Sequence, residues 1–158
     1  METAGSTALV TGGARRVGRA FSLALAEAGC DVVVNYNDSA AEATETVAAV
    51  EALGRRALAV QADISSTADR ERLVAETERA FGRLDILVNN ASLFERTPFA
   101  DVTEADWDRV LGVNLRAPFF LSQAAAPLLR RTGGVIVNIV DLSAMQPWPS
   151  FAHHADGI

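Results

Sequence analysis

The chain has 158 residues, of which 49% are apolar, and a formal net charge of −6. This length suits one domain with a single hydrophobic core. The negative charge argues against binding to nucleic acid or to an anionic membrane surface. No apolar run reaches the ~20 residues of a membrane span, and the N-terminus lacks a basic and apolar leader. With Cys30 as the single cysteine, we expect a soluble cytoplasmic protein without intrachain disulfides.

Five short runs rich in Val, Ile and Leu alternate with helical patterns. Such runs are typical of strands that are buried on both faces of a parallel sheet. Gly29 and Gly54 end the first two helices, Ser66 caps the third, and Thr103 caps a fourth. A longer helix is expected from about Asn114 to Arg131. The expected strands are residues 7–11, 31–35, 57–61, 84–89 and 135–140.

This order of elements predicts an α/β fold with a doubly wound parallel sheet. Right-handed crossovers arrange the five strands in the order 3-2-1-4-5, counted along the chain. No repeat, linker or low-complexity segment interrupts the pattern, so residues 1–158 are expected to form one domain.

A glycine-rich turn joins the first strand to the first helix. Residues 11–18 read Thr-Gly-Gly-Ala-Arg-Arg-Val-Gly. Backbone amides at such a turn, together with the N-terminus of the helix, bind phosphate well. The spacing is Thr-Gly-x-x-x-Arg-x-Gly rather than the Gly-x-Gly-x-x-Gly of long-chain dehydrogenases. Arg16 adds a fixed cation that suits an additional phosphate.

This motif resembles that of the short-chain dehydrogenase/reductase family, and specifically its pteridine reductase branch. A turn that binds no ligand is the alternative for an isolated motif. The segment Asn89-Asn90-Ala91-Ser92 is similar to the family's Asn-Asn-Ala-Gly, with serine in place of glycine. The resemblance implies a Rossmann-like fold. It covers nearly the whole chain, but only the first two thirds of a typical member, because the family's last two strands have no counterpart here.

The residues that follow the second strand indicate the dinucleotide. An acidic residue at this strand end commonly binds the ribose 2′-hydroxyl of NAD. Here Asn35 is expected at the strand end, and its neutral amide would not repel a 2′-phosphate. NADP(H) is therefore the expected cofactor, although Asp38 argues against it unless it caps the next helix. The expected cofactor contacts are Gly12, Arg15, Arg16, Val17, Gly18, Asn35, Tyr36, Asn37, Ser39, Asp63, Ile64, Asn90, Ala91 and Ser92.

The resemblance also implies roles for single residues. Asp63 would meet the adenine edge, or else act only as an acid at a helix start. Ser92 would contact cofactor and substrate, and Phe94 would stack on a pterin ring or simply pack on the next helix. Asn114 would hold a water of the proton relay through its backbone carbonyl, or cap a helix. Asp141, where most members have serine, would deliver a proton or bind substrate, or be a solvated acid.

One departure from the family affects the catalytic pair. Members carry a tyrosine 13 residues after the position of Asp141, and a lysine four residues later. These positions are His154 and Ile158 here, the chain contains no lysine, and its single tyrosine is Tyr36. Histidine can donate a proton near neutral pH, but nothing replaces the lysine, so we do not expect His154 to be catalytic. Adjacent histidines rarely bind one ion, so no metal site is expected at residues 153–154.

Two functions of different classes remain. One is an NADPH-dependent reductase of a pteridine-like or other carbonyl or imine compound, with a 3-oxoacyl thioester or sugar reductase as a further alternative. The other is a non-catalytic dinucleotide-binding remnant. We expect a truncated reductase, in which residues 135–140 would form an exposed apolar edge. The expected partner is a small-molecule substrate, without nucleic acid or membrane. The resemblance implies that full-length relatives are homo-oligomeric, and the oligomeric state of this chain stays open.

Overall fold

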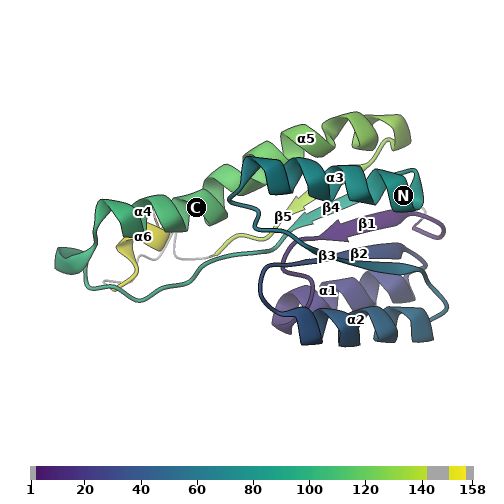
Figure 1. Cartoon of the computed structure of the whole chain (residues 1–158), viewed down its shortest axis with the longest axis horizontal. Helices are drawn as coiled ribbons and strands as arrows, with labels where there is room; N and C mark the ends of the chain where they lie inside the picture. Colours follow the sequence, from purple (N-terminus) through teal and green to yellow (C-terminus); the bar gives the residue numbers. More distant parts are fainter. Residues whose placement is uncertain (1–2, 142–149, 156–158) are drawn as a thin grey trace.

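The computed structural model describes residues 3–141 and 150–155. Its centre is a parallel sheet of five strands in the order β3-β2-β1-β4-β5 (Figure 1), which confirms the α/β fold and the strand order expected from the sequence. Parallel pairing brings the carboxyl ends of all five strands to one edge. The strands are β1 (Thr7–Val10), β2 (Asp31–Tyr36), β3 (Ala57–Gln61), β4 (Ile86–Asn89) and β5 (Val135–Asn138).

Helices cover both faces of the sheet. α1 (Arg16–Glu27) and α2 (Ala40–Ala52) lie on one face, and α3 (Thr67–Phe81) and α5 (Ala117–Thr132) lie on the other (Figure 1). Successive strand side chains point to opposite faces, so the core divides in two. Leu9 belongs to the half that includes residues of α3 and α5, whereas its neighbours Ala8 and Val10 belong to the half beneath α1 and α2.

Several elements extend beyond the carboxyl edge of the sheet. They are α4 (Glu104–Leu111), a π-helical turn (Gly112–Arg116), the 3-10 helix Phe99–Asp101 and the short α6 (Ala152–Ala155). The π-helical turn joins α4 directly to α5, so the separate helix start expected near Asn114 is wrong. None of the helices in the described ranges has the length and apolar character that a membrane crossing requires.

The expected helix signals are confirmed in detail. Ser66 accepts a hydrogen bond from the Asp69 amide at the start of α3, and Thr103 forms a complete capping box with Asp106 at the start of α4. Gly29 and Gly54 follow α1 and α2 with positive φ values of 93° and 75°. The left-handed conformation that ends a helix costs glycine little.

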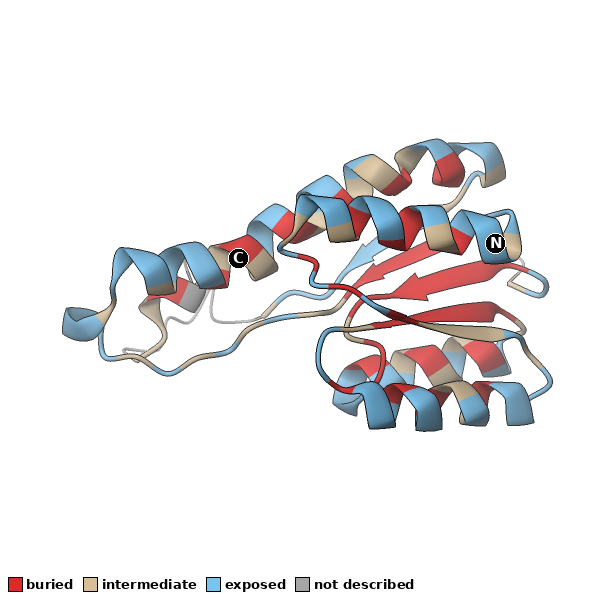
Figure 2. Cartoon of the chain, viewed as in Figure 1, coloured by how far each residue is buried: buried red, intermediate tan, exposed pale blue. Residues whose placement is uncertain are grey.

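β5 forms one edge of the sheet, and its residues are exposed (Figure 2), as the sequence led us to expect. The strand ends at Asn138, two residues earlier than expected. Its partner β4 ends at Asn89, which pairs with Asn138, so the ladder has no further partner residue.

Two buried carboxylates fasten the opposite, amino-terminal edge. Asp31 accepts hydrogen bonds from the backbone and side chain of Arg56, and Asp85 accepts them from the Thr7 amide and from Arg83. Burial alone would raise the pKa of each carboxyl, but these hydrogen bonds and charges outweigh it, so each pKa lies below its ordinary value. The two carboxylates therefore stabilise the folded state in their ionised form.

This arrangement predicts how acid affects stability. A carboxyl whose pKa is lower in the folded chain contributes stability above its unfolded pKa of about 4, and this contribution is lost as the pH falls through the folded pKa. Asp85→Asn should lower the free energy of unfolding at pH 7 by about 2 kcal/mol. It should also flatten the dependence of that free energy on pH below pH 5, as measured by urea denaturation. Asp101→Asn, which changes an exposed carboxylate, is the control; an unchanged pH slope in Asp85→Asn would contradict the assignment.

Candidate functional site

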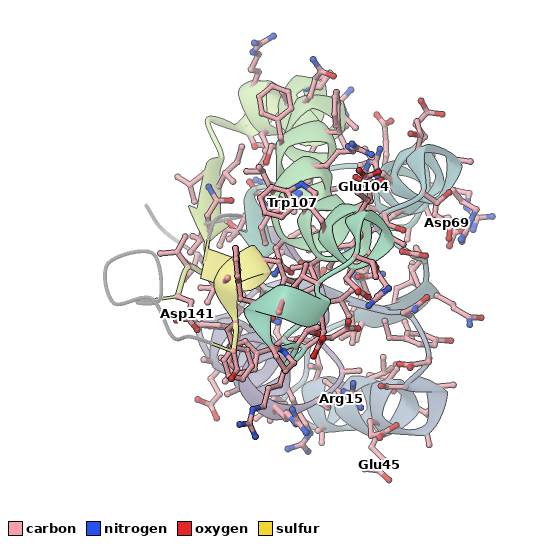
Figure 3. All side chains as sticks on the ribbon, turned by 90° about the vertical axis from the view of Figure 1, so that its left-hand side faces the viewer. Arg15, Glu45, Asp69, Glu104, Trp107 and Asp141 are labelled. Carbon is pink, nitrogen blue, oxygen red and sulfur yellow. The ribbon has the colours of Figure 1, made fainter. Side chains whose placement is uncertain are left out.

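A cleft of about 1120 Å³ lies along the carboxyl edge of the sheet. Every residue of the expected cofactor and substrate sites lines it, together with Asn114 and Asp141. In Figure 3, which looks toward this edge, Asp141 lies beside the end of β5 and Arg15 lies near α1 and α2. His154 belongs to α6, but its side chain lies outside the described residues. The contacts of these residues with a cofactor stay a prediction.

The glycine-rich turn between β1 and α1 packs without room for side chains. A Cβ on Gly18 would overlap the carbonyl oxygen of Gly12 and lie 2.7 Å from Nδ2 of Asn90. A Cβ on Gly12, whose φ is 59°, would lie 3.1 Å from Cα of Ala91. Only glycine allows this approach. The turn therefore has the shape of a phosphate cradle, and the residues present fit a dinucleotide.

The carbonyl groups of this turn are held from behind by neighbouring elements. The Gly13 carbonyl accepts a hydrogen bond of 3.0 Å from the Ser22 hydroxyl, and the Ala14 carbonyl accepts one of 2.9 Å from the Thr46 hydroxyl of α2. Each carbonyl points away from the N–H group of the same peptide plane. The amides of Ala14 and Arg15 therefore face the other way, as an anion-binding turn requires.

Two cations stand next to the cradle. Arg15 precedes α1, and Arg16 begins it with a φ of 50°, a left-handed conformation that arginine rarely adopts. Both side chains are exposed and line the cleft, and neither forms a salt bridge with any residue in the described ranges. They are placed to neutralise an anionic ligand.

The structure corrects the expected position of Asn35. β2 continues to Tyr36, so Asn35 is not the strand end. Asn35 is only 2% exposed. Its side-chain Nδ2 donates a hydrogen bond of 3.0 Å to the Ala62 carbonyl, and its Oδ1 accepts one of 3.3 Å from the Gly12 amide. Asn35 thus braces the glycine turn and the segment after β3 from within, rather than presenting its amide to a ribose.

Asp38, which follows β2, does not cap the next helix as expected. Ser39, not Asp38, holds the N-cap position of α2. The Ser39 hydroxyl donates a hydrogen bond of 3.3 Å to the carboxylate of Asp38, which itself lines the cleft. An acidic group therefore lies in the wall of the cleft just after β2.

Asp63 lies in the segment that joins β3 to α3. Its carboxylate accepts a hydrogen bond of 2.9 Å from the Ser65 amide, and its own amide donates one of 2.8 Å to Asp69. A side-chain hydrogen bond from Arg72, followed by the one from the Asp63 amide, lowers the pKa of the Asp69 carboxyl. The negative charge of Asp69 thus fixes the Asp63 backbone.

Asn114 acts through its side chain rather than as a helix cap. It lies inside the π-helical turn, where its Oδ1 accepts a hydrogen bond of 2.8 Å from the Leu93 amide and its Nδ2 donates one of 3.0 Å to the Leu93 carbonyl. On the other side of this loop, the Thr11 hydroxyl accepts hydrogen bonds from the amides of Asn90 and Ala91. The loop that carries Ser92 is therefore held at both ends. π-Helical turns often occur at functional sites.

The expected stacking residue already has an aromatic partner. The ring of Phe94 stacks on that of Phe151, with centroids 4.3 Å apart and planes inclined by 14°. Phe94 is still 48% exposed. One ring face is thus in contact with Phe151.

Part of the cleft was missed by the sequence analysis. The side-chain Nδ2 of Asn89 on β4 donates hydrogen bonds to the Ser122 hydroxyl of α5 at 3.2 Å and to Oδ1 of Asn138 on β5 at 2.8 Å. All three residues line the cleft. The available signal was the recurrence of asparagine near the ends of strands, at Asn35, Asn89 and Asn138. Within residues 3–141 and 150–155, no three His, Cys, Asp or Glu residues are grouped to hold a metal.

Known proteins share both the sequence and the fold. The hydroxynaphthalene reductase-like protein Arp2 of Metarhizium robertsii is 40% identical over 151 residues, a match that covers 96% of this chain and 57% of that protein. The 2-dehydro-3-deoxy-D-gluconate 5-dehydrogenase of Escherichia coli is 39% identical over 160 residues, covering 98% of this chain and 62% of the relative.

Solved structures agree with these matches. A short-chain dehydrogenase from Burkholderia cenocepacia, crystallised in complex with NADP, has a TM-score of 0.92 and 42% identity; 99% of this chain and 64% of that chain are covered. This chain thus spans less than two thirds of each of these relatives. The family model for short chain dehydrogenases matches residues 6–155. The chain therefore belongs to the short-chain dehydrogenase/reductase family.

Proposed function

We propose that this chain binds NADP(H) and forms part of an oxidoreductase acting on a carbonyl or imine compound. The observation that carries the proposal is the glycine turn, whose carbonyls are held from behind while Arg15 and Arg16 stand free of salt bridges in the described structure. The relative from Burkholderia cenocepacia was crystallised with NADP, which supports the same choice for this chain.

The preference for NADP(H) rests on charge. A 2′-phosphate adds about two negative charges near neutral pH, and arginine binds such a group with charge-assisted hydrogen bonds. The negative charge of Asp38 opposes this attraction. Its carboxylate, however, accepts a hydrogen bond from the Ser39 hydroxyl, and the two positive charges of the arginines exceed its single negative charge. A neutral 2′-hydroxyl would gain much less from the same arginines, because it carries no charge.

Calorimetric titration with NADP⁺ and NAD⁺ tests this proposal. The double variant Arg15→Gln/Arg16→Gln should weaken binding of NADP⁺ by at least about tenfold, because charge-assisted hydrogen bonds are lost. Binding of NAD⁺ should change by less than about threefold, because NAD⁺ has no 2′-phosphate. Arg19→Gln is the matched control, since Arg19 is exposed on the same helix but does not line the cleft. Equal losses for both nucleotides, or none, would refute the preference.

When bound, NADPH supplies a hydride. In this proposal Asn90, Ala91 and Ser92 position the nicotinamide end of the cofactor. Asp141 holds or delivers a proton near the substrate. Asp141 is half-buried and lines the cleft after β5. Asn114 keeps the Ser92 loop in place through Leu93.

Binding without turnover is the second candidate. These 158 residues contain no lysine, and their single tyrosine is Tyr36, at the end of β2. Two strands, β1 and β4, separate β2 from β5, after which Asp141 lies. NADPH oxidation, followed by its absorbance, distinguishes the two candidates. Stoichiometric binding with no oxidation in the presence of substrates favours the second, whereas sustained oxidation favours the first.

We propose a flat bicyclic substrate. Phe94 lines the cleft with a partly exposed ring, and planar rings gain from contact with an aromatic face. Pteridines have this shape, and so do the hydroxynaphthalenes for which the fungal relatives are named. The alternative is a sugar substrate, because the Escherichia coli relative is named as a dehydrogenase of a sugar acid.

Replacing the ring tests this substrate class. In the presence of saturating NADP⁺, Phe94→Ala should weaken binding of dihydrobiopterin or of a hydroxynaphthalene by about five- to tenfold, because a stacking contact is worth about 1 kcal/mol. Binding of 2-dehydro-3-deoxy-D-gluconate should not change. Phe99→Ala is the control, because Phe99 is more exposed and does not line the cleft. If the sugar acid alone binds, the flat-ring assignment is wrong.

A further inference from the structure

Arg70 is a buried arginine without an acidic partner. Its residue is only 4% exposed, and no salt bridge to Arg70 occurs among the residues that the structure describes. One of its nitrogens, Nη1, donates to the carbonyls of Ile64 at 2.6 Å and Ser65 at 2.8 Å, and Nη2 donates to the Thr67 hydroxyl at 2.9 Å. Its guanidinium also lies 5.7 Å from the ring centre of Phe120. Burying such a charge is costly unless its donors are satisfied.

The two carbonyls that Arg70 binds belong to peptide groups whose opposite ends bind Asp63. The Ile64–Ser65 peptide gives its carbonyl to Arg70 and its N–H to the Asp63 carboxylate, at 2.9 Å. The Ser65–Ser66 peptide gives its carbonyl to Arg70 and its N–H to the Asp63 carbonyl, at 3.0 Å. A positive charge at one end of a peptide strengthens the hydrogen bond donated at the other. Arg70 is thus connected to Asp63 through two peptide groups.

One carboxylate oxygen of Asp63, Oδ2, takes no part in these hydrogen bonds. The amide of Asp63 donates to Asp69, its carbonyl accepts from Ser66, and its Oδ1 accepts from Ser65. Within residues 3–141 and 150–155, Oδ2 accepts no hydrogen bond. Asp63 is exposed on the wall of the cleft. Asp63 therefore has a fixed orientation with one acceptor available.

Arg72 does not share the role of Arg70. It lies on the exposed side of α3, where it pairs with Asp69 and Glu76 and donates to the Gln61 carbonyl. Solvent screens these pairs, and such exposed pairs contribute little. Arg70, in contrast, lies on the buried stripe of α3 with Leu73 and Thr77.

We propose that Arg70 is a positioning residue that orients Asp63 to accept a hydrogen bond from the amino group of the adenine. This inference rests on the proposed binding of NADP(H). It predicts that recognition of the adenine amino group depends on a side chain that does not touch the nucleotide. Arg70 itself acts only through the Ile64–Ser65 and Ser65–Ser66 peptide groups.

The test compares NADP⁺ with its hypoxanthine analogue, in which a carbonyl oxygen replaces the adenine amino group. The wild-type chain should bind NADP⁺ at least about tenfold more tightly, because an acceptor then faces the Asp63 carboxylate instead of a donor. Arg70→Lys keeps a charge but loses the planar guanidinium, whose Nη1 binds both peptide carbonyls while its Nη2 binds the Thr67 hydroxyl. It should reduce this ratio to about threefold or less. Arg79→Lys on the same helix should leave it unchanged, because Arg79 is exposed and has no part in these contacts.

A double-mutant cycle separates positioning from loss of stability. Asp63→Asn should also remove most of the discrimination, and Arg70→Lys added to Asp63→Asn should reduce it no further, because both act through one carboxylate. A merely structural role would change the affinity for both nucleotides alike and leave their ratio intact. An unchanged ratio in Arg70→Lys, or independent effects in the cycle, would overturn the proposal.

Hydrogen exchange in the ligand-free chain gives a readout that needs no nucleotide. Arg70→Lys should raise the exchange rates of the Ser65 and Ser66 amides by about tenfold relative to Arg79→Lys. Unchanged rates would refute the coupling of Arg70 to Asp63. A wild-type chain that binds neither nucleotide would instead refute the proposed function and the adenine role with it, while the exchange rates would still decide the coupling.

Discussion

The site depends on the close approach of three backbone segments at the carboxyl edge of the sheet. The turn after β1, the start of α1 and the loop after β4 meet where Gly12, Gly18 and Asn90 leave no space for another Cβ. Asn90 Nδ2 also donates to the Thr11 carbonyl at 2.9 Å, so contact and hydrogen bonding act together. This packing fixes which way the peptide groups of the turn face, and an anion-binding surface needs that orientation before any ligand arrives.

Most of the supporting polar groups come from segments distant in the sequence. Thr46 on α2 and Asn35 on β2 hold the turn, Asn114 in the π-helical turn holds the loop after β4, and Arg70 on α3 holds the segment after β3. Each of these side chains forms hydrogen bonds with backbone groups near the cleft. Buried polar side chains therefore support backbone groups that line part of the cleft.

Local signals allowed much of this structure to be predicted. The alternation of apolar runs with helical stripes determined the sheet order, and the Ser66 and Thr103 caps are local hydrogen bonds that a short sequence window contains. The role of Asn35 could not be found in this way. β2 is one residue longer than expected, and the partners of Asn35, the Gly12 amide and the Ala62 carbonyl, lie more than 20 residues away in the sequence.

Long-range contacts explain the other differences. Asn114 was interpreted as a possible helix cap, but its side chain instead forms hydrogen bonds with Leu93 inside a π-helical turn that joins α4 to α5. Arg70 did carry a signal, since an arginine lies three residues before Leu73 on an otherwise buried stripe. Its partners, however, are backbone carbonyls that no side-chain pattern reveals.

The proposed function depends on binding of the dinucleotide phosphates by the glycine turn. The most direct measurement is the change in backbone amide NMR shifts as NADP⁺ is added to the ¹⁵N-labelled chain. If the turn binds the phosphates, the shifts at Ala14, Arg15 and Gly18 should change saturably, and the shift at Asp85 on the opposite edge of the sheet should not change. Saturable binding that leaves the amides of residues 12–18 unshifted would contradict it.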